Sequence, residues 1–191
     1  MEKTSWPNGR ASTDLSVYDN SWWKPGPKWK IILWFLVSPV FINTYLPVPM
    51  ALKRLVLRLF GAKIGVGLAI KPGVNIKFPW LLTIGNYVWI GEKVWIDNLT
   101  EVTIGDHACI SQGALLETGN HNYRIRTFDL FVKPIHLENG VWIGANSVVC
   151  PGVTCHSHSI LTAGSVATRS LDAYGIYQGN PAVWVKTREI A

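Results

Sequence analysis

The chain has 191 residues, of which 48% are hydrophobic and 16% are charged, so its composition excludes an intrinsically disordered protein. Lysine and arginine number 18 and aspartate and glutamate 12, which gives a formal net charge of +6. This basic excess suits an anionic partner, such as a phosphate-bearing small molecule or an anionic membrane surface. The charge is small and no nucleic-acid-binding motif accompanies it, so we expect no nucleic-acid partner.

The cysteine pattern and the first residues indicate a cytoplasmic protein. Cys109, Cys150 and Cys155 are odd in number and have no metal-ligand spacing, so we expect three reduced thiols. The N-terminal sequence lacks the order of charged, apolar and small residues that marks a secretory signal peptide.

The N-terminal third is divided into a polar arm and an apolar segment. Residues 1–30 are polar and rich in tryptophan and proline, which predicts an extended arm. Residues 31–52 carry no charge and could reach about 33 Å as a helix. Three prolines interrupt them and basic residues flank both ends. We therefore expect a helix in the membrane interface, or packed on the end of the following domain, rather than a span.

Residues 49–61 are expected to form an amphipathic helix. Leu52, Leu55, Val56 and Leu59 recur at helical spacing and predict one apolar face. We expect this helix to cap the open end of the following domain, to contact anionic lipid, or to do both. Together, residues 31–60 are the part of the chain from which we expect peripheral membrane contact.

The rest of the chain is dominated by a repeat of six residues. An aliphatic residue or its equivalent recurs every six positions, and a small or β-branched residue usually follows four positions later. The repeat positions are Ile64, Ile70, Ile76, Ile84, Ile90, Ile96, Ile104, Ile110, Leu116, Ile135, Ile143, Val149, Cys155 and Leu161.

A period of six fits neither an α-helix nor a simple strand, but it fits a short strand followed by a turn. Three such sides make a triangular coil whose apolar interior is covered only by neighbouring coils. The pattern predicts an all-β solenoid of about five coils. We assign an arm to residues 1–30, a helical segment to 31–61, the solenoid to 62–172 with an extruded loop at 117–134, and a tail to 173–191.

The repeat is interrupted once, and the interruption contains a histidine. No hexad can be written between Leu116 and Ile135, where the sequence is polar and aromatic. A loop extruded from a regular scaffold is a frequent location for function. The loop residue His121 is therefore the first candidate for chemistry.

These features resemble the hexapeptide-repeat acetyltransferases, in the branch of galactoside and maltose O-acetyltransferases. The segments FGAKIG, IKFPW, ISQGALLETGNHNY, FDL, PGV and GNPAVWVK are most similar to the colanic acid biosynthesis acetyltransferase family. The resemblance implies a left-handed parallel β-helix and a homotrimer with active sites between neighbouring subunits. It also implies transfer of an acetyl group from acetyl-CoA to a sugar hydroxyl in exopolysaccharide biosynthesis, without a metal.

In such an enzyme His121 would be the general base. Imidazole can remove a proton from a sugar hydroxyl near neutral pH while the oxygen attacks the thioester. A direct transfer in a ternary complex is expected. Glu117 lies four residues earlier. It either orients His121 or is a solvated carboxylate, and the sequence leaves both roles equally open.

The resemblance also assigns the acetyl-CoA site. Trp142 would pack on the pantetheine arm, the backbone amide of Ala145 would face the thioester oxygen, and the nucleotide end would meet Ala163, Thr168, Arg169 and Lys186. Val183 stands where relatives carry a basic residue, so one phosphate contact is expected to be missing.

The acceptor site is less defined. Asp97 and Asn98 are polar residues on a coil expected to face the loop, and they either bind sugar hydroxyls or close a corner. Trp89 and Trp95, six residues apart, are expected to share one face. That face either stacks on sugars or forms a subunit contact, and we favour the contact.

Two other functions occur on the same fold. A γ-class carbonic anhydrase has this fold and needs three histidine ligands for zinc, whereas the sequence offers one close pair, His156 and His158. A non-catalytic β-helix scaffold would be indicated by a loop without histidine.

Overall fold

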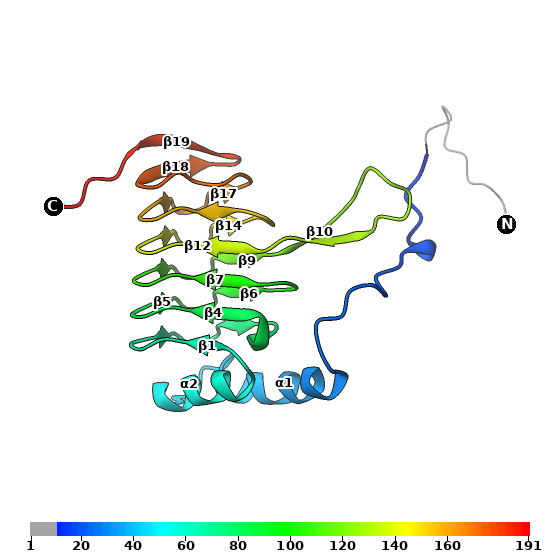
Figure 1. Cartoon of the computed structure of the whole chain (residues 1–191), viewed down its shortest axis with the longest axis horizontal. Coiled ribbons are helices and arrows are strands. Elements are labelled where there is room, and N and C mark those ends of the chain that lie inside the picture. The colour runs from blue at the N-terminus through cyan, green and yellow to red at the C-terminus, as the bar shows by residue number, and fades with distance from the viewer. Residues whose placement is uncertain (1–10) are drawn as a thin grey trace.

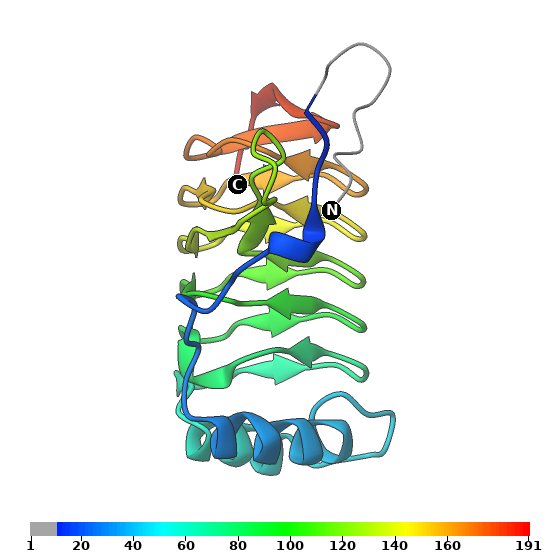
Figure 2. The same ribbon diagram turned by 90° about the vertical axis from the view of Figure 1, so that its right-hand side faces the viewer.

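The computed structural model describes residues 11–191; the part of the expected arm that covers residues 1–10 lies outside the described residues. A three-sided solenoid stands on two helices, and one hairpin projects from its side (Figure 1). The N-terminal arm rises from the helices on the side of the solenoid from which the hairpin projects, and it reaches the tip of the hairpin (Figures 1 and 2).

The solenoid consists of three sheets of short strands. The first sheet contains β1 (Lys63–Ile64), β4 (Leu82–Ile84), β7 (Val102–Ile104), β12 (Ile135–Leu137) and β15 (Thr154–Cys155). The second contains β2 (Ala69–Ile70), β5 (Trp89–Ile90), β8 (Cys109–Ile110), β13 (Trp142–Ile143), β16 (Ile160–Leu161), β18 (Gly175–Gly179) and β19 (Ala182–Thr187). The third contains β3 (Asn75–Ile76), β6 (Trp95–Asp97), β9 (Leu115–Glu117), β14 (Val148–Val149) and β17 (Val166–Ala167).

The predicted hexad positions form the core. Ile70, Ile90, Ile110, Ile143 and Leu161 follow one another in parallel register along the second sheet, and all five are buried. Each coil therefore covers the apolar interior of the next, as the repeat predicted. The architecture is the predicted parallel β-solenoid.

The solenoid has about six turns rather than five, because the expected tail belongs to it. Within residues 173–191, β18 pairs in parallel with β16, and Tyr177 lies opposite Leu161 in a buried position. The chain then reverses, and β19 pairs with β18 in antiparallel orientation. Residues 175–187 of the expected tail are therefore two strands of the second sheet, and Tyr177 takes the inward position that an aliphatic residue takes in the other coils.

Close stacking of the coils explains the glycines that follow inward residues. A Cβ atom on Gly144 would lie 2.4 Å from the backbone nitrogen of Ala163 in the next coil. Backbone atoms cannot move aside as a flexible side chain can, so glycine is required at this corner.

Two helices close the lower end of the solenoid, α1 (Lys28–Phe41) and α2 (Met50–Leu59). Trp34 of α1 is fully buried, and its indole N–H donates a 2.8 Å hydrogen bond to the Ile76 carbonyl of the first coil. The helical region thus begins at Lys28, three residues before the expected boundary, because Pro27 can precede a helix without losing a hydrogen bond. None of the described helices has both the length and the apolar character needed to cross a membrane.

The buried face of α2 differs from the expected one. Lys53, Val56 and Leu57 are buried, whereas Leu55 and Leu59 are exposed. The Lys53 ammonium donates to the Ile70 carbonyl at 3.3 Å, and burial lowers the pKa of its side chain. The expected face is therefore only partly the buried one: Leu52 and Val56 pack on the solenoid, and Lys53 is buried because the Ile70 carbonyl at the open end accepts its hydrogen bond.

The expected extruded loop is a two-stranded antiparallel hairpin. It consists of β10 (Gly119–His121) and β11 (Leu130–Val132), and it leaves the solenoid between β9 and β12 (Figure 1). A short 3-10 helix, η1 (Leu15–Val17), lies in the arm, and a second, η2 (Pro79–Leu81), takes up the extra residues of one corner.

Candidate active site

The hairpin presents His121 beside the solenoid. His121 is the last residue of β10 and pairs with Leu130 of β11. The base of the hairpin is fixed by a 2.9 Å hydrogen bond from the Lys133 N–H to the Thr118 carbonyl. His121 is half-buried, so its position is restrained while the ring stays accessible.

Phe128 determines which nitrogen of His121 carries a proton. The Nδ1 atom of His121 lies 2.9 Å from the carbonyl oxygen of Phe128. A carbonyl oxygen only accepts hydrogen bonds, so a neutral imidazole must carry its proton on Nδ1 and keep the lone pair on Nε2. Within residues 11–191, Nε2 has no hydrogen-bond partner. The free Nε2 is suited to accept a proton.

The ring of Phe128 also stacks on the ring of His121, with centroids 4.6 Å apart and planes 7° from parallel. Phe128 has a φ of 53°, in the left-handed region that bulky residues rarely adopt. This unusual backbone conformation lets one residue contribute both its ring and its carbonyl to the imidazole. Sequence reasoning missed Phe128, although the segment FDL in the loop was a signal.

Glu117 does not orient His121. The hydrogen bond that orients the imidazole comes from Phe128, and Glu117 lies opposite Asp97 in the pairing of β9 with β6. Burial raises the pKa of the Glu117 carboxyl, and the negative charge of Asp97 raises it further. Of the two roles that the sequence left open for Glu117, the structure does not support the orienting one, because Glu117 is the last residue of β9 and the chain has left the solenoid before it reaches His121.

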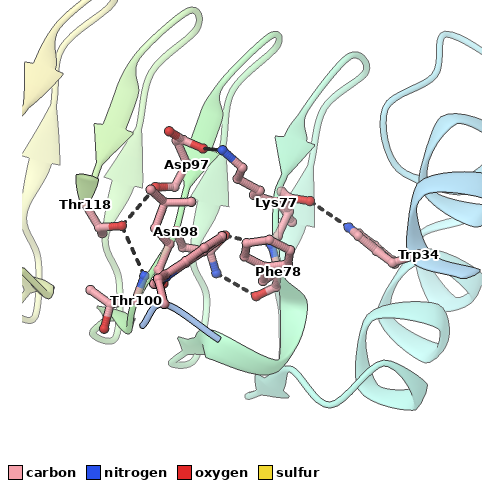
Figure 3. Close-up of polar contacts among 10 residues, drawn as sticks. Trp34, Lys77, Phe78, Asp97, Asn98, Thr100 and Thr118 are labelled. Atoms are coloured by element: carbon pink, nitrogen blue, oxygen red, sulfur yellow. Dashed lines mark hydrogen bonds and ion pairs between the residues drawn. The ribbon is translucent and has the colours of Figure 1, made fainter. Parts of the chain in front are cut away.

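Glu117 belongs to an outward column of side chains at the corner from which the hairpin leaves. Lys77, Asp97 and Glu117 occupy equivalent positions in the first three coils. Asp97 forms a 2.7 Å ion pair with Lys77, as Figure 3 shows. Cys150 follows in the fourth coil, and burial and the charge of Glu117 raise the pKa of its thiol. The column therefore places charged groups next to the hairpin.

Asn98 is a structural residue and not an accessible substrate contact. Its side chain is fully buried, with its carbonyl oxygen 3.0 Å from the Phe78 N–H and its NH2 group 2.6 Å from the Phe78 carbonyl (Figure 3). Thr118 occupies the equivalent place one coil later and donates to the Asp97 carbonyl at 3.0 Å. Of the two roles that the sequence left open for Asn98, the structure supports closure of the corner, because the buried amide binds the backbone of Phe78.

The structure brings Trp142 and Lys186 together on the second sheet. Both line a groove with Ile160 and Ile176, and the Trp142 indole N–H donates to the Ser111 hydroxyl at 2.9 Å. Ala145 and Ala163 lie at successive turns of the corner that follows this sheet, linked by a hydrogen bond from the Gly164 N–H to the Ala145 carbonyl. These four candidate positions therefore follow one edge of the solenoid.

Thr168 and Arg169 do not lie on the edge that carries Trp142. They are exposed residues directly after β17, at the corner that carries the hairpin two coils below. The structure thus divides the expected acetyl-CoA contacts between two edges.

Trp89 and Trp95 are also separated, since β5 belongs to the second sheet and β6 to the third. They do not share a face because six residues advance the chain by one side of the triangle.

Two of the other histidines, His156 and His158, have local partners. His156 Nδ1 lies 2.9 Å from the Glu138 carboxylate, and the His158 ring stacks on Tyr174 at 4.8 Å. The hydrogen bonds from His156 and Ser157 lower the pKa of Glu138. Across residues 11–191, no group of three or more His, Cys, Asp or Glu side chains is placed to hold a metal ion.

No family model matches the chain, but it resembles individual acetyltransferases. It is 38% identical over 159 residues to an Escherichia coli K12 protein provisionally named colanic acid biosynthesis acetyltransferase WcaF, covering 83% of this chain and 87% of that protein. It is 28% identical to the galactoside O-acetyltransferase of the same organism, over 63% of this chain and 61% of that protein.

The fold agrees with that of solved acetyltransferases. A hexapeptide-repeat acetyltransferase from Vibrio cholerae in complex with acetyl-CoA has a TM-score of 0.70 and 27% identity, covering 78% of this chain and 81% of that one. A galactoside acetyltransferase in complex with coenzyme A has a TM-score of 0.75 over 83% of this chain and 80% of that one, at 23% identity. The neighbours are left-handed β-helix proteins, in agreement with the expected fold.

Proposed function

Because the chain belongs to the hexapeptide-repeat acetyltransferase family, we propose that it transfers an acetyl group from acetyl-CoA to a hydroxyl of a sugar. One observation carries the mechanism: the Phe128 carbonyl holds the proton of His121 on Nδ1 and leaves Nε2 free. The similarity to WcaF supports an acceptor that belongs to exopolysaccharide biosynthesis.

In the proposed reaction Nε2 of His121 takes the proton of the acceptor hydroxyl while its oxygen attacks the thioester carbonyl carbon. The tetrahedral intermediate then collapses, the carbon–sulfur bond breaks, and the imidazolium returns its proton to the thiolate of CoA. No covalent acetyl-enzyme is needed, because both substrates are bound at once. The stacked ring of Phe128 keeps the imidazole in place during both proton transfers.

The acetyl-CoA site is proposed along the edge of Trp142, Ala145, Ala163 and Lys186. The groove beside Trp142 is apolar at Ile160 and Ile176 and basic at Lys186, which suits a pantetheine arm ending in phosphates. The N–H of Ala145 is free of hydrogen bonds to residues 11–191 and is available to the thioester oxygen. Arg169 and Thr168 would complete the nucleotide end from a neighbouring subunit.

We propose a homotrimer, and this division of the site between two edges supports a subunit interface. In one chain His121 projects from the corner after the third sheet, whereas Trp142 lies on the second sheet. Packing the hairpin corner of one subunit against the Trp142 edge of the next would bring base and thioester together. Light scattering should give a trimer mass, and a fully active monomer would contradict the proposal.

The acceptor is proposed to bind beside the column that contains Asp97 and Glu117. Carboxylates accept hydrogen bonds from sugar hydroxyls, and both lie at the corner from which the hairpin leaves. The function is tested by a transfer screen with labelled acetyl-CoA over free sugars, nucleotide sugars and lipid-linked saccharides. Labelled product that disappears with His121→Ala supports the proposal, whereas hydrolysis of acetyl-CoA without transfer to any sugar would contradict it.

We also propose that the helical base contacts the cytoplasmic surface of an anionic membrane. The apolar side chains of α1 that face away from the solenoid are exposed, with Ile32 61%, Phe35 54% and Leu36 68% accessible. A helix that is apolar on its free side as well as its packed side is suited to insertion among lipid acyl chains. Leu55 and Leu59 of α2 add to this exposed surface.

The charge of the base supports an anionic lipid surface. No aspartate or glutamate occurs between Asp19 and Glu92. This part of the chain contains the basic residues Lys24, Lys28, Lys30, Lys53, Arg54, Arg58, Lys63, Lys71 and Lys77. Basic residues beside an exposed apolar face attract anionic headgroups. The free cysteines fit the reducing cytoplasmic side of such a membrane.

A further inference from the structure

The N-terminal arm contacts the hairpin that carries His121, although more than a hundred residues separate them. The Asp14 N–H donates a 2.9 Å hydrogen bond to the Arg126 carbonyl at the tip of the hairpin. The Asp14 carboxylate also forms an ion pair with the Arg126 guanidinium and lies only 27% exposed. The arm is therefore attached to the hairpin by both backbone and side chain.

The lower part of the arm is attached to the solenoid. The Trp23 indole N–H donates to the Leu99 carbonyl at 2.9 Å, and its ring packs on Phe78 with centroids 5.7 Å apart. The Trp80 indole N–H donates to the Pro25 carbonyl. Residues 15–22 are thus held between two fixed ends, along the face shown in Figure 2.

Tyr18 lies between these two attachments and contacts His121. The centroid of its ring lies 5.6 Å from that of the imidazole, with the planes tilted by 54°. Phe128 stacks on the same imidazole at 4.6 Å. His121 is thus contacted by two aromatic rings from separate segments, in geometries that aromatic pairs favour. The Tyr18 hydroxyl has no hydrogen-bond partner in residues 11–191, so the contact depends on the ring.

We infer that the arm is part of the catalytic site and that Tyr18 is a positioning residue for His121. The inference rests on the proposed role of His121 as the base. Phe128 covers only one face of the imidazole, so with Phe128 alone the ring could still rotate about its side-chain torsions. Tyr18 restricts that rotation, so Nε2 stays directed at the acceptor hydroxyl. Positioning of reacting groups contributes strongly to rate, and a displacement of about 1 Å can cost about 100-fold.

The kinetic test compares Tyr18→Ala with Tyr18→Phe in the full chain. Tyr18→Ala is expected to lower kcat about tenfold, the approximate value of one aromatic contact, and Tyr18→Phe should restore the wild-type value. The dissociation constant for CoA should not change in either variant. Leu15→Ala is the matched control, since Leu15 is an exposed residue of the same arm. A kcat of Tyr18→Ala within twofold of wild type would overturn the inference.

A spectroscopic readout separates positioning from folding and from the proposed function. Nitrogen NMR of labelled histidine reports whether Nδ1 or Nε2 carries the proton, and His121→Ala identifies the signal. Wild type and Tyr18→Phe should show His121 protonated on Nδ1, and Tyr18→Ala should show a mixture of both tautomers. An unchanged tautomer in Tyr18→Ala would overturn the inference even if activity falls. Full activity of His121→Ala would instead overturn the proposed function.

Discussion

The carbonyl oxygen of Phe128 lies 2.9 Å from Nδ1 of His121, and the ring of the same phenylalanine stacks on the imidazole. Phe128 therefore sets the tautomer of the proposed base and, together with the ring of Tyr18, its orientation. A carboxylate in this role would favour the charged imidazolium, whereas a neutral carbonyl does so much less. The arrangement is suited to a base that must accept a proton and then return it.

Replacing His121 by alanine should remove most of the chemical step. General-base catalysis contributes about 10²–10⁴-fold, so kcat should fall by that factor, roughly 3–5 kcal/mol of barrier. The CoA dissociation constant should stay unchanged, because the groove around Trp142 and Lys186 is untouched. His107→Ala is the control, since His107 stacks on Tyr87 at a distant corner. More than about a tenth of wild-type kcat in His121→Ala would contradict the role.

Removing the charge of Glu117 should stabilise the protein at neutral pH. Burial and Asp97 raise the pKa of Glu117 above its unfolded value of about 4.3, so the folded state binds that proton more tightly. Stability therefore falls as pH rises through the folded pKa, and the full cost is present above it. Glu117→Gln should raise Tm at pH 7 and lose this advantage below about pH 4.

The exposed Glu101 provides the control for this experiment. Glu101→Gln should leave the pH dependence of Tm close to that of wild type. Thermal unfolding of both variants from acidic to neutral pH checks the prediction. A lower Tm for Glu117→Gln at pH 7 would show that the carboxylate has a stabilising partner.

Asn98→Ala should destabilise the fold without a specific loss of acceptor binding. The substitution leaves the N–H of Phe78 without its partner, whereas the Phe78 carbonyl keeps its hydrogen bond from the Leu81 N–H. An unpaired buried polar group costs about 1–3 kcal/mol, so we expect a loss of about 1–3 kcal/mol in the free energy of unfolding. Denaturant unfolding measures this loss. A normal stability with a strongly raised KM for the acceptor would restore the interpretation of Asn98 as a substrate contact.

Trp142→Ala and Lys186→Ala should weaken acetyl-CoA binding. Trp142 offers an exposed aromatic surface, and Lys186 supplies a positive charge in the same groove. We expect an increase of about tenfold in the CoA dissociation constant for each, equivalent to about 1.4 kcal/mol. Calorimetric titration with CoA measures it, with Trp29→Ala on α1 as the control for loss of an exposed tryptophan. An unchanged constant in both groove variants would place the cofactor elsewhere.

The exposed face of α1 should bind anionic vesicles. Wild-type protein is expected to sediment with vesicles of phosphatidylglycerol and phosphatidylcholine, less with phosphatidylcholine alone, and less at high salt. Phe35→Asp with Leu36→Asp should abolish binding, because both side chains are exposed and their loss leaves the packing on the solenoid intact. The control is Val183→Asp at the opposite end of the solenoid. Equal binding by the Phe35 and Leu36 double variant would contradict a lipid-binding base.

The sequence by itself determined the repeating part of this protein. A hexad is a local pattern, and each inward residue meets its equivalent in the next coil, so Ile90 stacks on Ile70 without further information. The break in the pattern also located the hairpin and His121, because a segment without inward residues cannot join the solenoid core.

Only the tertiary structure decided what surrounds those residues. Tyr18 and Trp23 reach the hairpin and the solenoid through the docking of an arm that has no repeat of its own. The roles of Asn98 and Lys53 depend on which backbone groups the corner and the solenoid end leave unpaired. Local periodicity carries no information on such distant partners, because they are chosen by geometry after the coils have stacked.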